Sequence, residues 1–133
     1  MFDVDSFYNE VRGSVQEENC ITQIRFKTIC QVDARNGTIL RLVSCPNMGG
    51  LIEIVGIDGG YILHGETELF RYDKQLNRVW SFCGRDIFAT LDGSSAFWIE
   101  ADIIHCRDWL GWHYVLDYDG NLVAEFLETS PGS

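Results

Sequence analysis

Two histidines and one glutamate are the residues of this chain best suited to holding a metal ion. His64 and Glu66 alternate along one predicted strand, so their side chains share a face of that strand. His105 ends a similar Ile-Ile-His sequence farther along, and the three would suit a transition metal if the two strands are neighbours. A histidine in a half-buried strand is more commonly satisfied by a carbonyl or a carboxylate. We therefore predict no metal and no other cofactor, and keep a metal-dependent hydrolase only as an alternative.

Serine, cysteine and carboxylate side chains give little indication of catalysis. Ser94 and Ser95 lie in a glycine-serine loop without the sharp turn that exposes a serine nucleophile. Cys106 directly follows His105, so in a strand the two side chains point to opposite faces. Paired acids occur mostly in predicted hairpin turns, where aspartate is common because it bonds to the backbone. The sequence thus favours a protein that is not an enzyme.

The charge of the chain restricts its partners. Its 133 residues include 20 acids and 10 bases, a formal net charge of −10. Such a surface repels phosphates, so we expect neither nucleic acid nor a membrane as a partner. Nine of the acids but only two of the bases lie in residues 84–133. A carboxylate field of this kind attracts a basic protein.

An aromatic loop lies inside the acidic segment. It runs from Asp108 to Trp112 and holds two tryptophans within four residues. Such a loop either folds back onto the core, which is favoured because Trp112 begins a strand, or displays its tryptophans to anchor a protein partner or stack on a sugar. We predict a partner-binding set made of these aromatic residues and nearby acids: Glu100, Asp102, Asp108, Trp109, Trp112 and Asp117.

The cysteines and the start of the chain indicate a location. Five cysteines, an odd number, are widely spaced without a Cys-x-x-Cys pair, so we predict free thiols and no disulfide framework. The acidic start is followed by no apolar run, and no stretch approaches the roughly 18 apolar residues of a membrane span. We expect a cytoplasmic protein.

The remaining pattern predicts a single all-β domain over residues 1–133. One short helix over 3–12, ended by Gly13, precedes an antiparallel meander of short strands over 20–126 and a flexible tail over 128–133. Residues 20–32 alternate between polar and apolar and are predicted as one half-buried strand. The further strands are predicted over residues 38–43, 51–57, 61–64, 68–72, 76–82, 87–91, 96–100, 103–106, 112–117 and 122–126.

Two segments of this meander echo each other. Phe70–Asp73 leads through a turn into Leu76–Phe82, and Leu116–Gly120 leads into Leu122–Phe126. A strand ending in histidine precedes each, and the echoes are 41 to 46 residues apart, the length of one four-stranded blade. These hairpins resemble the outer hairpins of β-propeller blades of the quinoprotein-like and WD-type families.

The resemblance implies blade-like sheets, two of them, or nearly three when residues 20–43 are counted. A closed propeller needs about four or more blades. Two arrangements remain open. The sheets could stack as a sandwich within one chain, which we favour because a blade pair and a capping helix can bury their faces without partners. The alternative is a partial propeller completed by copies of the same chain, so an oligomer is an open possibility.

A second resemblance concerns function. The run Trp80–Phe88, followed by Asp102–Ile104, resembles the small acidic immunity proteins of bacterial polymorphic toxin systems. This resemblance implies a non-catalytic, cytoplasmic, inhibitor-type protein that masks a basic protein partner, here through its C-terminal half. A carbohydrate-binding, lectin-like module that uses Trp109 and Trp112 is the alternative.

Overall fold

The computed structural model describes residues 9–128. Within this part of the chain twelve strands form three four-stranded antiparallel sheets, and consecutive strands pair in each. We call each sheet a blade. Blade 1 consists of β1 (Gly13–Gln16), β2 (Cys20–Ile24), β3 (Thr28–Asp33) and β4 (Ile39–Ser44). Blade 2 consists of β5 (Leu51–Ile57), β6 (Gly60–Gly65), β7 (Glu68–Asp73) and β8 (Arg78–Cys83). Blade 3 consists of β9 (Phe97–Glu100), β10 (Ile103–Arg107), β11 (Trp112–Leu116) and β12 (Leu122–Leu127).

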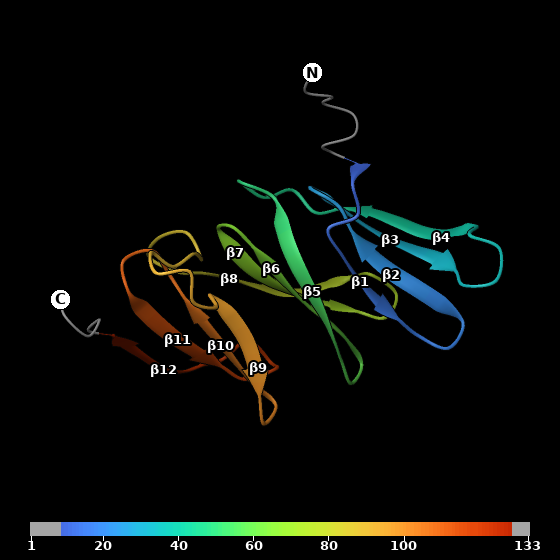
Figure 1. The fold of residues 1–133 in the computed structure, drawn as a ribbon. Coiled ribbons are helices and arrows are strands. Elements are labelled where there is room, and N and C mark those ends of the chain that lie inside the picture. Colours follow the sequence, from blue (N-terminus) through green and yellow to red (C-terminus); the bar gives the residue numbers. More distant parts are fainter. Residues whose placement is uncertain (1–8, 129–133) are drawn as a thin grey trace, which may run out of the picture.

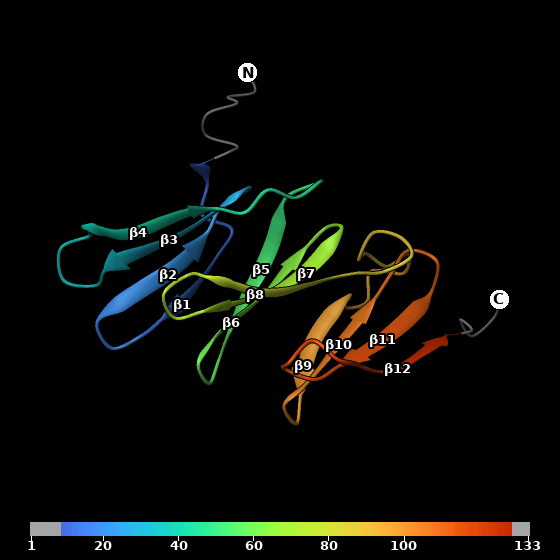
Figure 2. The ribbon, with the colours of Figure 1, turned by 180° about the vertical axis from the view of Figure 1, so that it is seen from behind.

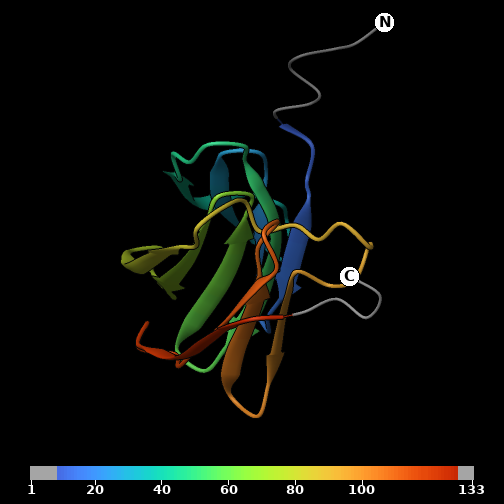
Figure 3. The ribbon, with the colours of Figure 1, turned by 90° about the vertical axis from the view of Figure 1, so that its left-hand side faces the viewer.

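The three blades lie side by side in chain order, with blade 2 between the other two (Figures 1 and 2). Seen along the row, the sheets lie one behind another (Figure 3). Blade 2 therefore has both faces covered, and every residue of β6 is buried. Blades 1 and 3 each have one face against blade 2 and one open face.

Two apolar cores fill the spaces between the blades. Because side chains alternate along a strand, Tyr61, Leu63 and Phe70 of blade 2 face blade 1, where they pack with Ile24 and Ile29. The intervening positions face blade 3 and pack in the second core, whose blade 3 side is made of Phe97, Ile104, Cys106, Tyr114 and Leu116. Each large apolar side chain buried in this way contributes roughly 1.5–3 kcal/mol. The face-to-face packing of sheets thus supplies most of the stabilisation that joins the blades.

The same hydrogen bond connects both pairs of neighbouring blades. Gln31 of β3 donates from Nε2 to the carbonyl oxygen of Lys74, at 2.8 Å. Arg71 occupies the same position in β7 and donates to the carbonyl oxygen of Tyr118, at 2.5 Å. Lys74 and Tyr118 both follow the aspartate that begins the last turn of their blade. The repetition shows that blade 2 sits on blade 1 as blade 3 sits on blade 2.

The last turns of blades 2 and 3 also share their chemistry. Asp73 accepts hydrogen bonds from the backbone N–H groups two and four residues later, Gln75 and Asn77, both at 2.9 Å. Asp117 accepts the same two bonds, at 3.0 and 2.9 Å. These aspartates stabilise a reversal of the chain by accepting hydrogen bonds from the backbone N–H groups of the turn. The internal echo predicted from the sequence is thus a true repeat of blades, with Asp73 equivalent to Asp117.

The all-β meander predicted from the sequence is confirmed, with three corrections. The single strand predicted over residues 20–32 is wrong, because residues 25–27 turn the chain and divide it into β2 and β3. Gly13 does not end a helix but begins β1, a strand that was not predicted. The strand predicted over Ile87–Leu91 is irregular, because this segment crosses from blade 2 to blade 3 while its buried Phe88 packs into the second core.

The predictions for the two ends of the chain fall largely outside the described residues. Of the helix predicted over residues 3–12, residues 3–8 lie outside the described residues; Asn9 is helical, and residues 10–12 are not. Residues 129–133 of the predicted flexible tail also lie outside the described part. Within residues 9–128 no helix is long and apolar enough to cross a membrane.

Candidate acidic interaction surface

The topology gathers six turns at one end of the blades. In a four-stranded meander the first and last turns lie at one end and the middle turn at the other. Contacts between blades confirm that these ends are adjacent, since Glu17 of the first turn of blade 1 pairs with Lys74 of the last turn of blade 2, at 2.5 Å. The first turns of the three blades all point down in Figure 1. We call this region, made of the six turns and the strand residue before each, the acidic end.

The acidic end holds most of the net charge of the molecule. It carries nine acids and two bases, whereas the turns and connections of the opposite end (25–27, 45–50, 66–67, 84–96 and 108–111) carry four acids and three bases. The charged residues of the acidic end are Glu17, Glu18, Asp33, Asp58, Asp73, Glu100, Asp102, Asp117 and Asp119, with the bases Arg35 and Lys74.

Interactions within the turns lower the pKa of three of these carboxylates. The Arg35 guanidinium lowers the pKa of Asp33, and backbone N–H groups of Asn77 and Asn121 lower the pKa of Asp73 and Asp117. A carboxylate with a lowered pKa stays ionised in mild acid. Turn formation and negative charge therefore come from the same residues.

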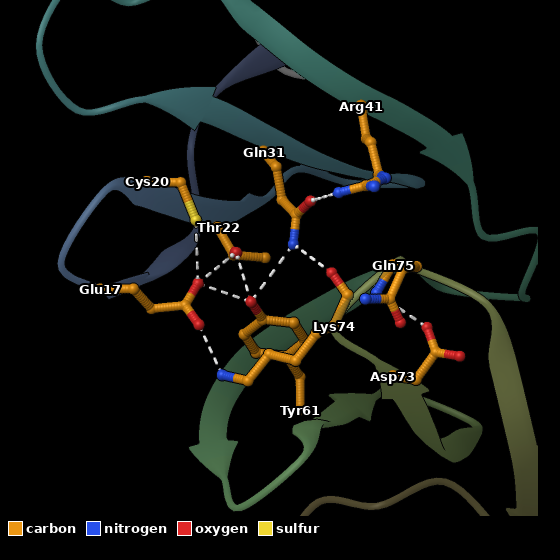
Figure 4. Close-up of polar contacts among 9 residues, drawn as sticks. All are labelled: Glu17, Cys20, Thr22, Gln31, Arg41, Tyr61, Asp73, Lys74 and Gln75. Carbon is orange, nitrogen blue, oxygen red and sulfur yellow. Dashed lines mark hydrogen bonds and ion pairs between the residues drawn. The ribbon is translucent and has the colours of Figure 1, made fainter.

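Glu17 joins two blades at the acidic end (Figure 4). Its carboxylate accepts hydrogen bonds from Tyr61, at 2.6 Å, and Thr22, at 3.1 Å, and from the Cys20 thiol at 3.2 Å, besides the ion pair with Lys74. Burial alone would raise the pKa of Glu17, but the hydrogen bonds, that from Lys74 first, outweigh it and lower the pKa to about 2. Glu17 thus acts as a fixed anion that clamps blade 1 to blade 2.

Of the other acids, Asp119 pairs with Arg71 at 3.9 Å, and four face solvent with their charge unneutralised. Glu18, Asp58, Glu100 and Asp102 are exposed and form no ion pair within residues 9–128. The two bases of the region are already occupied, Lys74 by Glu17 and Arg35 by Asp33 at 3.3 Å. A strongly negative, accessible surface remains.

The turn between β9 and β10 projects part of this charge outward. Ala101 and Asp102 have φ of 51° and 61°, so both lie in the left-handed region. Two such residues form the tight hairpin turn whose twist matches that of the strands. This turn presents Glu100 and Asp102 on the tip of blade 3.

The six residues predicted to bind a partner do not form one surface. Glu100, Asp102 and Asp117 lie at the acidic end, while Asp108, Trp109 and Trp112 lie at the opposite end of blade 3. Strands of four or five residues separate the two groups by roughly 13–17 Å. The aromatic loop and most of the predicted acids therefore point away from each other.

Asp108 and Trp112 take part in intramolecular contacts. The Asp108 carboxylate is buried and accepts hydrogen bonds from the Tyr114 hydroxyl, at 2.6 Å, and from the backbone N–H groups of Leu110 and Trp112. The Arg85 guanidinium lies 3.7 Å from the ring centre of Trp112 and pairs with Glu125. Trp109 remains 43% exposed. These contacts fix the loop between β10 and β11 to its own blade.

The structure does not bring together the histidines considered for a metal. His64 and His105 lie in different blades. His64 lies between the Glu53 carboxylate, 2.9 Å from Nδ1, and the carbonyl oxygen of Phe88, 3.1 Å from Nε2. Glu66 follows β6, in the turn at the end of blade 2 opposite the acidic end. No group of three His, Cys, Asp or Glu side chains within residues 9–128 has a geometry that could hold a metal ion.

Sequence reasoning missed Glu18, Asp58 and Asp119 as members of the same surface. Each stands in a first or last turn of its blade, so its position within the blade repeat was the available signal. The five cysteines, which the sequence predicts to be free, form no disulfide.

Comparison with known proteins supports the fold. No known family model matches the sequence, and no curated protein matches it. The crystal structure of the computationally designed Ika4 protein is similar with a TM-score of 0.67 and 15% identity, over 87% of this chain and 71% of that one. BamB from Moraxella catarrhalis is similar with a TM-score of 0.63 and 7% identity, over 86% of this chain and 34% of BamB. The WD40 domain of Neurospora crassa Pan2 is similar with a TM-score of 0.66 and 14% identity, over 88% of this chain and 38% of that one.

These likenesses confirm that the chain consists of propeller-type blades. At such low identities they concern the fold alone. The chain spans little more than a third of the length of BamB and of the Pan2 domain.

Proposed function

We propose that this chain is a non-catalytic, cytoplasmic binding protein of inhibitor or immunity type, and that its acidic end masks a basic protein. The observation that carries this proposal is the concentration of nine acids against two bases on six adjacent turns. The proposal changes the predicted location of the binding surface. Partner contact is assigned to the acidic end of all three blades rather than to the C-terminal half with its aromatic loop.

The physical basis is electrostatic attraction over a pre-formed surface. Charges on neighbouring turns act together at distances up to about 8 Å in physiological salt, so an approaching basic surface meets their summed field. The hydrogen bonds that fix Asp73 and Asp117 in their turns hold these charges in place before binding. A pre-organised surface loses less conformational freedom on association.

The lectin-like alternative is supported by no comparable observation. Its tryptophan loop lies at the end of blade 3 where the aspartate that would bind sugar hydroxyls, Asp108, is buried and already accepts three hydrogen bonds.

Titration with a lysine-rich peptide of defined length tests the proposal. We expect binding to the wild-type protein at about 50 mM salt, weakened at least about tenfold at about 300 mM. The triple variant Asp58→Asn, Glu100→Gln and Asp102→Asn should bind much more weakly.

The matched control removes three charges from the opposite end. It carries Glu66→Gln, Asp86→Asn and Asp92→Asn, so its net charge equals that of the first variant. Equal binding by the two variants would show that only net charge matters and would refute a localised site. A wild-type affinity that does not change with salt would refute the electrostatic basis.

A further inference from the structure

The open face of blade 3 carries an ordered row of rings across its four strands. Trp98 stacks on His105 with ring centres 5.0 Å apart, and His113 packs on Phe126 at 4.7 Å. His105 Nδ1 lies 2.9 Å from His113 Nε2, which joins the two pairs. His113 also bonds to the Glu128 carboxylate. The row is therefore fixed in its geometry within the single chain.

This face is equivalent to the faces that carry the contacts between blades. His113 is the second residue of β11, as Ile29 is of β3 and Leu69 of β7. Ile29 packs in the core between blades 1 and 2, and Leu69 in the core between blades 2 and 3. By the same repeat, the row of rings occupies the position where a fourth blade would pack.

The open face of blade 1 is the counterpart. Its strands place there the side chains that alternate with Ile24 and Ile29, and Leu42 among them is 56% exposed. In a chain of net charge −10, the residues that β1 to β4 place on this face include no acid and no base. Its strand residues are Ser14, Gln16, Ile21, Gln23, Thr28, Cys30, Val32, Ile39, Leu42 and Ser44. An uncharged, partly apolar sheet face of this kind suits burial rather than solvent.

We propose that a second copy of this chain covers both open faces, blade 3 of each copy packing on blade 1 of the other. Three blades cannot close a ring, whereas six fall within the usual range of about four to eight. The two faces belong to the same chain and are related as the faces already in contact twice within it, which makes a second copy the fitting occupant. Two identical contacts related by a two-fold axis complete the ring.

The new seam differs in one respect from the contacts within the chain. Val115 occupies the β11 position of Gln31 and Arg71, so the seam lacks the hydrogen bond that these two side chains donate to the next blade. The contact between copies is therefore weaker than the contacts within one copy, and the dimer dissociates on dilution.

Measurement of mass in solution by light scattering and by sedimentation tests the proposal. The wild-type chain should form a dimer of twice 15.2 kDa that dissociates on dilution. Leu42→Asp on the blade 1 face and Phe126→Asp on the blade 3 face should each give monomers. Val79→Asp is the matched control, because Val79 is 53% exposed but lies on the middle blade, and it should leave the dimer intact.

Mixing the variants distinguishes the proposed contact from a symmetric one. A mixture of the Leu42→Asp and Phe126→Asp monomers contains one intact pair of faces, so it should form a heterodimer held by one seam. If only one of the two substitutions abolished the dimer, the contact would join identical faces and the proposal would be wrong. A wild-type chain that is monomeric at every concentration, or that forms open polymers, would also overturn it.

A second pair of variants covers the case in which replacing an apolar residue by aspartate prevents folding. Ser44→Lys and Ala124→Lys add charge at small, exposed residues of the same two faces. Circular dichroism checks that they fold, and each should give monomers. A folded Ser44→Lys or Ala124→Lys chain that stays dimeric would contradict the proposed contact.

Discussion

Neutralising Glu17 should weaken the contact between blade 1 and blade 2 and lower the free energy of unfolding. In Glu17→Gln the side chain keeps its length and one oxygen that Tyr61 and Thr22 can use as acceptor. Its amide group then faces the Lys74 ammonium, which lies 2.5 Å from the carboxylate in the native protein. Two donors then face each other, and the ion pair is lost.

The size of the effect follows from the pKa of Glu17. The fall from 4.5 to about 2 corresponds to at most about 3 kcal/mol of stabilisation at neutral pH. Lys74 is 41% exposed, and solvent screening reduces the contribution to about 2 kcal/mol. Because the folded pKa is lowered, this contribution is complete above pH 4.5 and disappears as the pH falls toward 2.

Urea unfolding followed by tryptophan fluorescence measures this difference. At pH 7 the free energy of unfolding of Glu17→Gln should be about 2 kcal/mol below that of the wild-type protein, and near pH 2 the two should coincide. Glu18→Gln, an exposed chain neighbour, should lose almost nothing at either pH. Equal destabilisation of Glu17→Gln at both pH values would refute the role of its charge.

Three further outcomes test the local structure. Gly120→Ala should lower the free energy of unfolding by about 3 kcal/mol, because the φ of Gly120 is +86° and an added Cβ would lie 2.8 Å from an indole ring. Gly93 has a φ of +78° and open space around it, so in thermal unfolding Gly93→Ala should lower the free energy of unfolding by only about 1 kcal/mol. Asp108→Ala should cost about 3 kcal/mol in urea unfolding, because it leaves a buried tyrosine hydroxyl without its acceptor; a loss below about 1 kcal/mol would contradict its structural role. Burial, and then the neighbouring imidazole, lower the pKa of His105. An NMR titration should therefore place this pKa below 6.5, and the free energy of unfolding should fall as the pH drops below that value. A His105 pKa at or above 6.5 would contradict the prediction.

The fold could be predicted wherever turn chemistry is local. Asn36-Gly37 and Asp58-Gly59 mark their hairpins because these residues adopt left-handed or turn conformations readily. The turn over residues 25–27 escaped prediction because Arg, Phe and Lys carry no such signal and continue the alternation of polar and apolar residues. The buried segment around Phe88 was taken for a strand because apolar residues crossing between two blades have the composition of one.

The acidic surface could be predicted only in part. Counting charges along the chain placed the acidity in residues 84–133, a segment that includes Glu100 and Asp102. Glu18 and Asp58 join them because the blades stack in the same orientation, which brings turns distant in sequence to one end. Asp108 lies apart from them at the opposite end of blade 3, and nothing in its sequence neighbourhood indicates that the Tyr114 hydroxyl donates a hydrogen bond to its carboxylate.

NMR mapping of a bound lysine-rich peptide tests the proposed acidic binding surface most directly. The peptide is added to isotope-labelled protein at low salt, and the shift of each backbone amide signal is followed. We predict that the largest changes fall in the turns at residues 17–19, 58–59, 101–102 and 117–121 and vanish as salt is raised. Changes centred on the loop at residues 108–112, or spread evenly over the molecule, would contradict the account.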